Sequence, residues 1–202
     1  MGFYEQQILP RLLDFAMNTS RLAPYRERTI ARAEGRVLEI GVGSGANLPL
    51  YTDRVTEVLG LDPHPKMLEM AEKKTPSVET RIVRGSAEAI PLDEGSIDTV
   101  VSTWSLCSIP DPSKALREMH RVLKPGGLLV FVEHGRSTDE AVRKWQDRLN
   151  PLWRKMVGGC NLNRPIAELI RLADFQMKHV GTEYIPGPRP MTFQYEGWAQ
   201  KT

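Results

Sequence analysis

The feature that most constrains the fold is a short apolar run that passes directly into a glycine-rich loop. Residues 37–45 read Val-Leu-Glu-Ile-Gly-Val-Gly-Ser-Gly, with glycine at every second position from Gly41. Glycine accepts the backbone angles of a tight strand-to-helix turn and lets a ligand approach the backbone closely. In open α/β sheets, this turn lies where ligands bind. Taken alone, the loop fits a purely steric role equally well.

Strand-like and helical stretches alternate after this loop begins. Short β-rich runs are predicted at 37–40, 56–61, 80–83, 97–102 and 128–132, with helices at 65–73 and 113–123 between them. This alternation predicts an α/β fold with a Rossmann-like, doubly wound and mostly parallel sheet. The second helix is expected to end at Lys124-Pro125-Gly126-Gly127, because proline and glycine are helix-stopping residues.

The two ends of the chain flank this core. Apolar residues three to four positions apart predict an amphipathic helix over 3–18 that packs on a larger body, with Pro10 as a kink or a new turn. Two more helices are predicted at 140–149 and 164–173, and two strands at 177–184 and 192–198. We therefore predict one domain over 1–202, with a helical cap at 1–34, a cofactor-binding core at 35–135, and acceptor-side helices and C-terminal strands at 136–202.

Composition excludes several classes of function. The chain carries 27 basic and 25 acidic residues, a formal charge of +2, without a basic stripe, so nucleic acid is not an expected partner. Its only cysteines, Cys107 and Cys160, form neither a disulfide framework nor a metal motif, so we expect no metal site and a reducing, cytoplasmic location. The longest apolar run, at 128–132, is too short to cross a bilayer, and we expect no integral membrane segment.

A carboxylate follows the second predicted strand at the spacing of a nucleotide-binding site. Asp62 ends that strand and stands about twenty residues after Gly41, where a carboxylate accepts hydrogen bonds from both ribose hydroxyls. The alternative is a cap for the helix that begins near Pro63. The glycine loop upstream favours ribose binding.

Two features separate the possible nucleotide cofactors. A dehydrogenase that uses NAD would share the glycine loop and Asp62, but its GxGxxG fingerprint has a third glycine where this chain has Ala46. Glu39 ends the first predicted strand and brings negative charge into the glycine crevice. That charge is unfavourable beside a pyrophosphate and favourable beside the ammonium and sulfonium groups of S-adenosylmethionine.

Five sequence blocks in order resemble the motifs of class I S-adenosylmethionine-dependent methyltransferases. They are 39–45, 62–63, 85–91, 97–100 and 116–127. The resemblance implies a seven-stranded sheet with an antiparallel last strand, and S-adenosylmethionine as cofactor. It implies donor contacts by Glu39, Gly41 and Gly43 to the methionine portion, Asp62 to the ribose, Pro63 and Met67 to the adenosine flank, Ser86, Ala87 and Glu88 to the adenine, and Thr103 and Trp104 on the sulfonium side. Many relatives carry an acid at position 86, where serine is a weaker acceptor.

The methyl acceptor is expected to be a small molecule. Transfer from an activated sulfonium depends largely on alignment, but a thiol or hydroxyl acceptor must also lose a proton. His134, after the fifth predicted strand, is the candidate catalytic base, and a hydrogen-bonded loop residue is the alternative. Cys107 is a candidate for lining the pocket, although an isolated cysteine is more often a small buried apolar residue.

Segments beyond the common core resemble the methyltransferase-like protein 7 family, whose members methylate alkyl thiols. The matching residues lie at 102–108, 131–134, 150–153 and 158–162. The same region resembles bacterial phospholipid N-methyltransferases. A thiol or sulfide is therefore the implied acceptor, and phospholipid or small-amine methylation, a dehydrogenase and a noncatalytic nucleotide-binding subunit are the alternatives. Residues 145–161 are predicted to form either a lid or wall of the acceptor pocket, or plain core packing.

Overall fold

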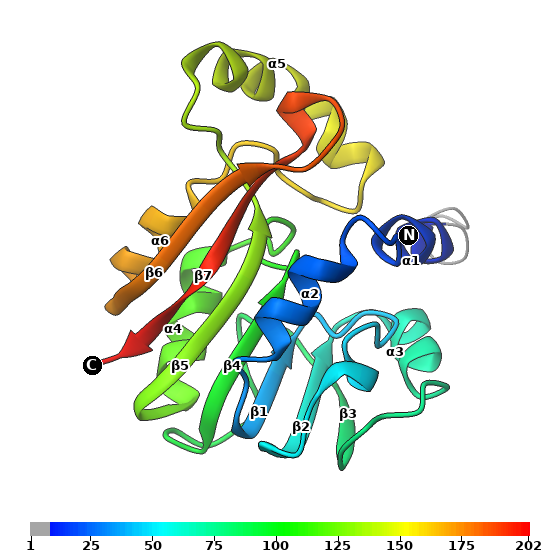
Figure 1. Cartoon of the computed structure of the whole chain (residues 1–202), viewed down its shortest axis with the longest axis vertical. Helices are drawn as coiled ribbons and strands as arrows, with labels where there is room; N and C mark the ends of the chain where they lie inside the picture. Colours follow the sequence, from blue (N-terminus) through cyan, green and yellow to red (C-terminus); the bar gives the residue numbers. More distant parts are fainter. Residues whose placement is uncertain (1–8) are drawn as a thin grey trace.

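A seven-stranded sheet lies at the centre of the computed structural model, which describes residues 9–202 (Figure 1). The strands are β1 Gly35–Ile40, β2 Val55–Asp62, β3 Thr80–Arg84, β4 Ile97–Thr103, β5 Leu123–His134, β6 Phe175–Tyr184 and β7 Phe193–Lys201. Their spatial order is β3-β2-β1-β4-β5-β7-β6. The first five pair in parallel, and β7 runs antiparallel to both β5 and β6. The predicted mostly parallel sheet with an antiparallel last strand is confirmed.

Helices cover both faces of this sheet. The helices are α1 Leu9–Met17, α2 Ala23–Ile30, α3 Pro65–Ala71, α4 Pro112–Val122, α5 Glu140–Met156 and α6 Ile166–Leu172, with short 3-10 turns η2 Leu48–Leu50 and η3 Arg189–Met191. One apolar core contains residues of α2 and α3, and a second contains residues of α4 and α6. Figure 1 shows α2 in front of the sheet and α4 behind it. The sheet is therefore doubly wound, as predicted.

The central strands are apolar on both faces because both faces are covered. Neighbouring side chains of a strand point to opposite faces, so Val37 packs with the α2 and α3 layer and Leu38 with the α4 and α6 layer. Val100 and Val101 of β4 divide in the same way. Polar groups then gather at the carboxyl ends of the strands, where Glu39, Asp62 and His134 lie.

Two predicted boundaries differ most from the structure. The helix predicted at 140–149 continues to Met156 through Pro151, and Asp139 caps its start by accepting the amide hydrogens of Ala141 and Val142. Lys124-Pro125-Gly126-Gly127 belongs to β5, because the chain passes from α4 directly into that strand. Local stop signals located the end of α4 but carried no information about the strand pairing that follows.

The predicted N-terminal helix lies only partly within the described residues. Helix α1 is described over Leu9–Met17, and the residues predicted as helical before it lie outside the described part of the chain. Leu12 and Phe15 are exposed, so the expectation that these two side chains pack on a larger body is wrong. Within residues 9–202, no helix is both long enough and apolar enough to span a bilayer.

Candidate functional site

The carboxylate of Glu39 is the centre of a buried polar network at the end of β1. Its Oε1 accepts a hydrogen bond from Asn47 Nδ2 at 2.7 Å, and its Oε2 accepts one from the Tyr51 hydroxyl at 2.9 Å. Burial raises the pKa of Glu39 to about 7, although these hydrogen bonds and the charge of Arg26 act to lower it. A cation beside Glu39 would stabilise the ionised carboxylate, so this position suits a positively charged ligand group.

Arg26 of α2 links this network to Trp104. Its Nη1 donates to Asn47 Oδ1 at 2.6 Å, and its guanidinium lies 5.0 Å from the centre of a Trp104 ring. The Trp104 indole donates to Gln194 Oε1 at 2.6 Å. Trp104 has a φ of 51°, which is strained for a bulky residue and requires support from its neighbours. Thr103, just before it, accepts a hydrogen bond from Asn47 Nδ2 at 3.1 Å.

The glycine loop lies directly against the segment that follows β4. Gly41 and Gly43 have φ values of 65° and 55°, in the left-handed region that glycine favours. A Cβ placed on Gly41 would lie 2.3 Å from Ser105 Oγ. A larger residue at position 41 would therefore displace either the glycine loop or Ser105.

Asp62 is joined to the same loop by its carboxylate. One oxygen accepts the amide hydrogen of Gly43 at 3.1 Å, and the other accepts that of His64 at 2.8 Å. A carboxylate has about four lone-pair positions, so each oxygen can accept another hydrogen bond. The cap position of α3 is His64, not Asp62. Pro63 is exposed, and Met67 Cε lies 3.3 Å from where a Cβ on Gly43 would stand.

The segment predicted to meet adenine forms a turn beyond β3. Ser86 Oγ accepts the amide hydrogen of Glu88 at 3.1 Å, and Glu88 Oε1 accepts that of Asp111 at 2.6 Å. Ala87 is buried between them. The polar side chains of this turn are therefore held by backbone groups.

Glu133, at the end of β5, holds the loop that follows β4. Its Oε1 accepts hydrogen bonds from Ser102 Oγ at 2.7 Å and from the amides of Ser105 and Leu106 at 3.0 and 3.1 Å. Its Oε2 accepts the Cys107 amide hydrogen at 3.3 Å. Burial raises the pKa of Glu133 to about 7, while these hydrogen bonds act to lower it. Glu133 therefore acts as a structural acid that fixes the course of this loop.

Next to this loop, His134 lies beside Cys160, which in turn interacts with Cys107. His134 Nδ1 lies 3.7 Å from Cys160 Sγ, and its buried Nε2 has no hydrogen-bond partner among the described residues. Interaction with the Cys107 thiol and with His134 lowers the pKa of Cys160, while the Cys160 interaction and burial raise that of Cys107. Cys160 is therefore the more acidic thiol of the pair.

Asn161 fastens the Cys160 segment to the loop after β4. Its backbone N–H and its Nδ2 both donate to the Cys107 carbonyl at 2.9 Å, and Nδ2 also donates to the Gly159 carbonyl at 2.9 Å. Arg164 donates to the carbonyl of Leu106. These bonds hold the Cys160 segment and the loop after β4 together next to His134.

Residues 145–161 only partly match the alternatives drawn from the sequence. Asn150 on the inner side of α5 accepts the amide hydrogen of Leu162 at 2.8 Å, and Trp153 interacts with Cys160, so this side forms a wall of the cluster. Trp145, Leu152 and Met156 are exposed. Plain core packing is therefore wrong for these three side chains.

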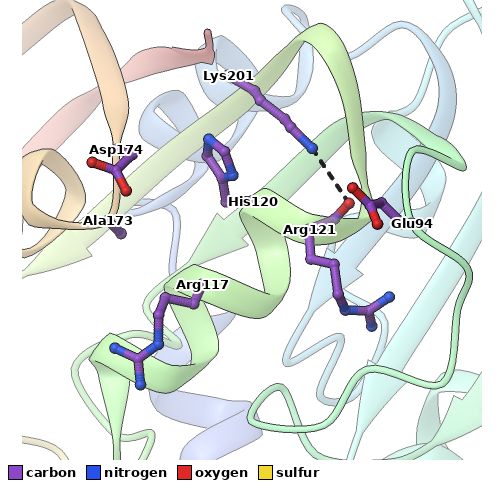
Figure 2. Close-up of a pocket in the computed structure, with 7 residues that line it drawn as sticks. All are labelled: Glu94, Arg117, His120, Arg121, Ala173, Asp174 and Lys201. Carbon is purple, nitrogen blue, oxygen red and sulfur yellow. Dashed lines mark hydrogen bonds between the residues drawn. The ribbon is translucent and has the colours of Figure 1, made fainter.

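A cavity of about 360 Å³ lies elsewhere, beside α4 and the end of β7 (Figure 2). Because β7 is antiparallel, Lys201 lies near the amino end of β5, away from His134. Lys201 Nζ donates to the Arg121 carbonyl at 3.4 Å, and the side chains of Arg117 and Arg121 point away from His120 in Figure 2. The groups that line this cavity do not converge on a common point, so it is not the functional site.

Several members of the site were not predicted from the sequence. Asn47 and Tyr51 follow the glycine loop closely enough to have been found as partners for Glu39. Arg26 and Gln194 carried no comparable signal, because only the folded chain brings α2 and β7 to Trp104.

The class of the protein follows from this fold and a family match. Residues 38–131 match the Methyltransferase domain family. Together with the glycine loop, Glu39 and Asp62 at the carboxyl ends of a doubly wound sheet, this match identifies residues 38–131 as a methyltransferase domain of the S-adenosylmethionine-dependent class. S-adenosylmethionine is thus its methyl donor, and the dehydrogenase alternative no longer applies.

Within that class, two relatives bear on the acceptor. Thiol S-methyltransferase TMT1B of Rattus norvegicus is 37% identical over 161 residues, 77% of this chain and 65% of that protein. Phosphatidylethanolamine N-methyltransferase of Cereibacter sphaeroides is 35% identical over 130 residues, 61% of this chain and 63% of that protein. The matched region thus spans just under two thirds of the length of each relative.

Solved structures share the architecture. A SAM-dependent methyltransferase of Thermotoga maritima, described as a possible histamine N-methyltransferase, matches with a TM-score of 0.69 and 24% identity, covering 95% of this chain and 94% of the other. This likeness concerns the fold alone.

Proposed function

We propose that the chain transfers a methyl group from S-adenosylmethionine to the sulfur of a small apolar thiol. The observation that carries the proposal is the buried Nε2 of His134, which has no partner among the described residues while Nδ1 of the same ring lies beside the Cys160 thiol. The similarity to thiol S-methyltransferase TMT1B supports the same acceptor class. Two free cysteines agree with a reducing, cytoplasmic location, which remains part of the proposal.

The residues at the strand ends fit the donor. Glu39 offers a buried carboxylate to the ammonium group, and Asp62 retains an acceptor position on each oxygen for the ribose hydroxyls. Gly41 and Gly43 leave the loop free of side chains beside the methionine portion. Bound there, the sulfonium supplies an already activated methyl group. Pro63, Met67, Ser86, Ala87, Glu88, Thr103 and Trp104 remain proposed contacts of the adenosine and sulfonium groups.

His134 then handles the proton of the acceptor thiol. In the neutral imidazole with its hydrogen on Nδ1, His134 donates that hydrogen to the Cys160 sulfur. The imidazole therefore has its lone pair on Nε2, which takes the thiol proton as the sulfur attacks the methyl carbon. His134 is buried, which limits access of water to this position.

The test compares three acceptors with one carbon skeleton: benzyl mercaptan, benzylamine and benzyl alcohol. Transfer from isotopically labelled S-adenosylmethionine is expected for the thiol, at a rate at least tenfold above that for the amine or the alcohol. Turnover of the amine alone would favour amine methylation, the class of the Cereibacter sphaeroides relative. No turnover of any of the three acceptors, with donor binding intact, would favour the alternative of a noncatalytic nucleotide-binding subunit.

The role of His134 is tested by His134→Gln. We expect kcat on the thiol to fall about 10²-fold while the affinity for S-adenosylhomocysteine changes less than twofold, because a base acts only on the acceptor. The loss should shrink above about pH 9, where aliphatic thiols ionise unaided. His179→Gln, at an exposed position on β6, is the matched control. A loss that is constant with pH would assign His134 a structural role.

A further inference from the structure

Helix α5 has an apolar surface that the rest of the described chain leaves uncovered. Trp145, Leu152 and Met156 are 54%, 61% and 55% exposed. At about 100° per residue, these three side chains lie within about 40° of one another around the helix axis. They therefore form one stripe along the 17 residues of the helix. Scattered exposed apolar residues are ordinary, whereas an aligned set on one helix indicates a contact surface.

A basic flank borders this stripe. Lys144, Arg148 and Lys155 are exposed and also fall within about 40° of one another, centred about 80° from the apolar stripe. The Arg148 guanidinium lies 5.6 Å from the centre of a Trp145 ring, so the basic and apolar sides adjoin. Lys144 pairs with Glu140 in an exposed ion pair at 3.0 Å. The near-neutral charge of the whole chain conceals this local excess of positive charge.

The buried side of α5, about 95° around the helix axis from the apolar stripe and opposite the basic flank, faces the candidate acceptor site. Val142 and Gln146 are buried, and Gln146 donates to the carbonyls of Gly135 and Pro190 at 3.0 and 3.2 Å. Asn150 and Trp153 carry this contact on to the Cys160 segment. Figure 1 shows α5 beyond the ends of the strands, away from the sheet faces that the other helices cover. The stripe and its basic flank are thus presented outward, next to the acceptor wall.

We propose that α5 is an interfacial helix that docks the protein on an anionic lipid bilayer. Trp145, Leu152 and Met156 enter the boundary between headgroups and acyl chains, while Lys144, Arg148 and Lys155 contact anionic headgroups. Basic residues beside apolar ones match a surface that is both negatively charged and apolar, which favours a bilayer over an uncharged protein groove. Docking places the His134 and Cys160 wall near the depth where apolar small molecules partition.

The first test uses wild-type protein in vesicle flotation. Vesicles of phosphatidylcholine with 30% phosphatidylglycerol should bind the protein at least tenfold more tightly than vesicles of phosphatidylcholine alone. Sodium chloride at 0.5 M should weaken binding about tenfold, because salt screens exposed charges. Equal binding to both vesicle types, or no binding to either, overturns the proposal.

Variants then locate the surface. The triple change Trp145→Ser, Leu152→Ser and Met156→Ser should lower binding at least tenfold, and all three sites are exposed, so folding should persist with an unchanged circular dichroism spectrum. Leu172→Ser, at an exposed apolar residue of α6, is the matched control and should bind as wild type. Normal binding by the triple variant overturns the proposal.

Two further measurements separate other occupants of the stripe. If Leu12→Ser with Phe15→Ser, on the exposed side of α1, abolishes binding while the α5 triple variant does not, the lipid surface is on α1 and the proposal fails. Light scattering after size exclusion tests a second copy of the chain as the occupant. A wild-type dimer that the triple variant converts to a monomer, without vesicle binding, also overturns it. None of these measurements depends on which acceptor is methylated.

Discussion

The sharpest test of the donor site is Asp62→Asn. This change keeps the size of the side chain but removes its charge and replaces one acceptor oxygen with an NH₂ group. In the structure, the two oxygens of Asp62 face the amide hydrogens of Gly43 and His64. Either orientation of an asparagine therefore sets its NH₂ group against a backbone N–H, and it also leaves fewer acceptor positions for the ribose.

The expected magnitude follows from the hydrogen bonds lost. A hydrogen bond to a charged group contributes about 1.5–3 kcal/mol, and the variant loses one such bond and the charge on the other. We expect a loss of about 2 kcal/mol in the free energy of binding, which is roughly a 30-fold rise in Kd. The backbone contacts are weakened as well, so the melting temperature should also fall.

Isothermal titration with S-adenosylhomocysteine measures this effect directly. Asp53→Asn is the matched control, since Asp53 is an exposed aspartate in the turn before β2. Its Kd should equal that of the wild type. A Kd for Asp62→Asn within threefold of wild type, in a variant that is folded at the assay temperature, would refute the assignment of Asp62 to the ribose.

Three further outcomes are expected. Gly41→Ala should destabilise the protein by about 2 kcal/mol more than Gly95→Ala in urea unfolding, since both glycines have a positive φ but only Gly41 would bring a Cβ against Ser105; equal losses would contradict this. Asn161→Ala should cost about 1–3 kcal/mol in the same assay, because two carbonyls lose its side-chain donor. Because the pKa of Glu39 is raised to about 7 in the folded protein, protonation of this group stabilises the fold at pH values below its unfolded pKa near 4.5. This contribution is lost as the pH rises through about 7. The free energy of unfolding should therefore be higher at pH 5 than at pH 8, and this difference should be up to about 3 kcal/mol larger in the wild type than in Glu39→Gln. Parallel pH profiles of the two proteins would contradict the burial argument.

The fold was predictable because its signals are local and repeated. Each central strand is an apolar run, and the glycine loop sets the first turn, so the alternation alone specified a parallel doubly wound sheet. Strand ends were harder to predict. The early start of β5 depends on Leu123 pairing with Ile97, and a pairing partner on another strand leaves no mark in the local sequence. The end of α5 was equally hard to predict, because a proline usually ends or kinks a helix, whereas α5 continues through Pro151 to Met156.

The site was predictable only where one segment supplies its chemistry. Glu39 and Asp62 stand at fixed distances from the glycine loop, so spacing alone could identify them. The contact of His134 with Cys160 joins residues 26 positions apart, and that of Trp104 with Gln194 joins residues 90 positions apart. Such contacts arise from tertiary packing, which no short motif encodes.

The loop after β4 is held almost entirely through its backbone. Glu133 accepts the amides of Ser105, Leu106 and Cys107, and Asn161 donates to the carbonyl of Cys107. The course of the loop therefore depends mainly on Glu133 and Asn161, neither of which belongs to it. The side chains of Leu106 and Cys107 are themselves buried, whereas Ser108 is only partly buried. A substitution at Ser108 should thus cost little folding stability, because the groups that hold the backbone of the loop lie elsewhere in the chain.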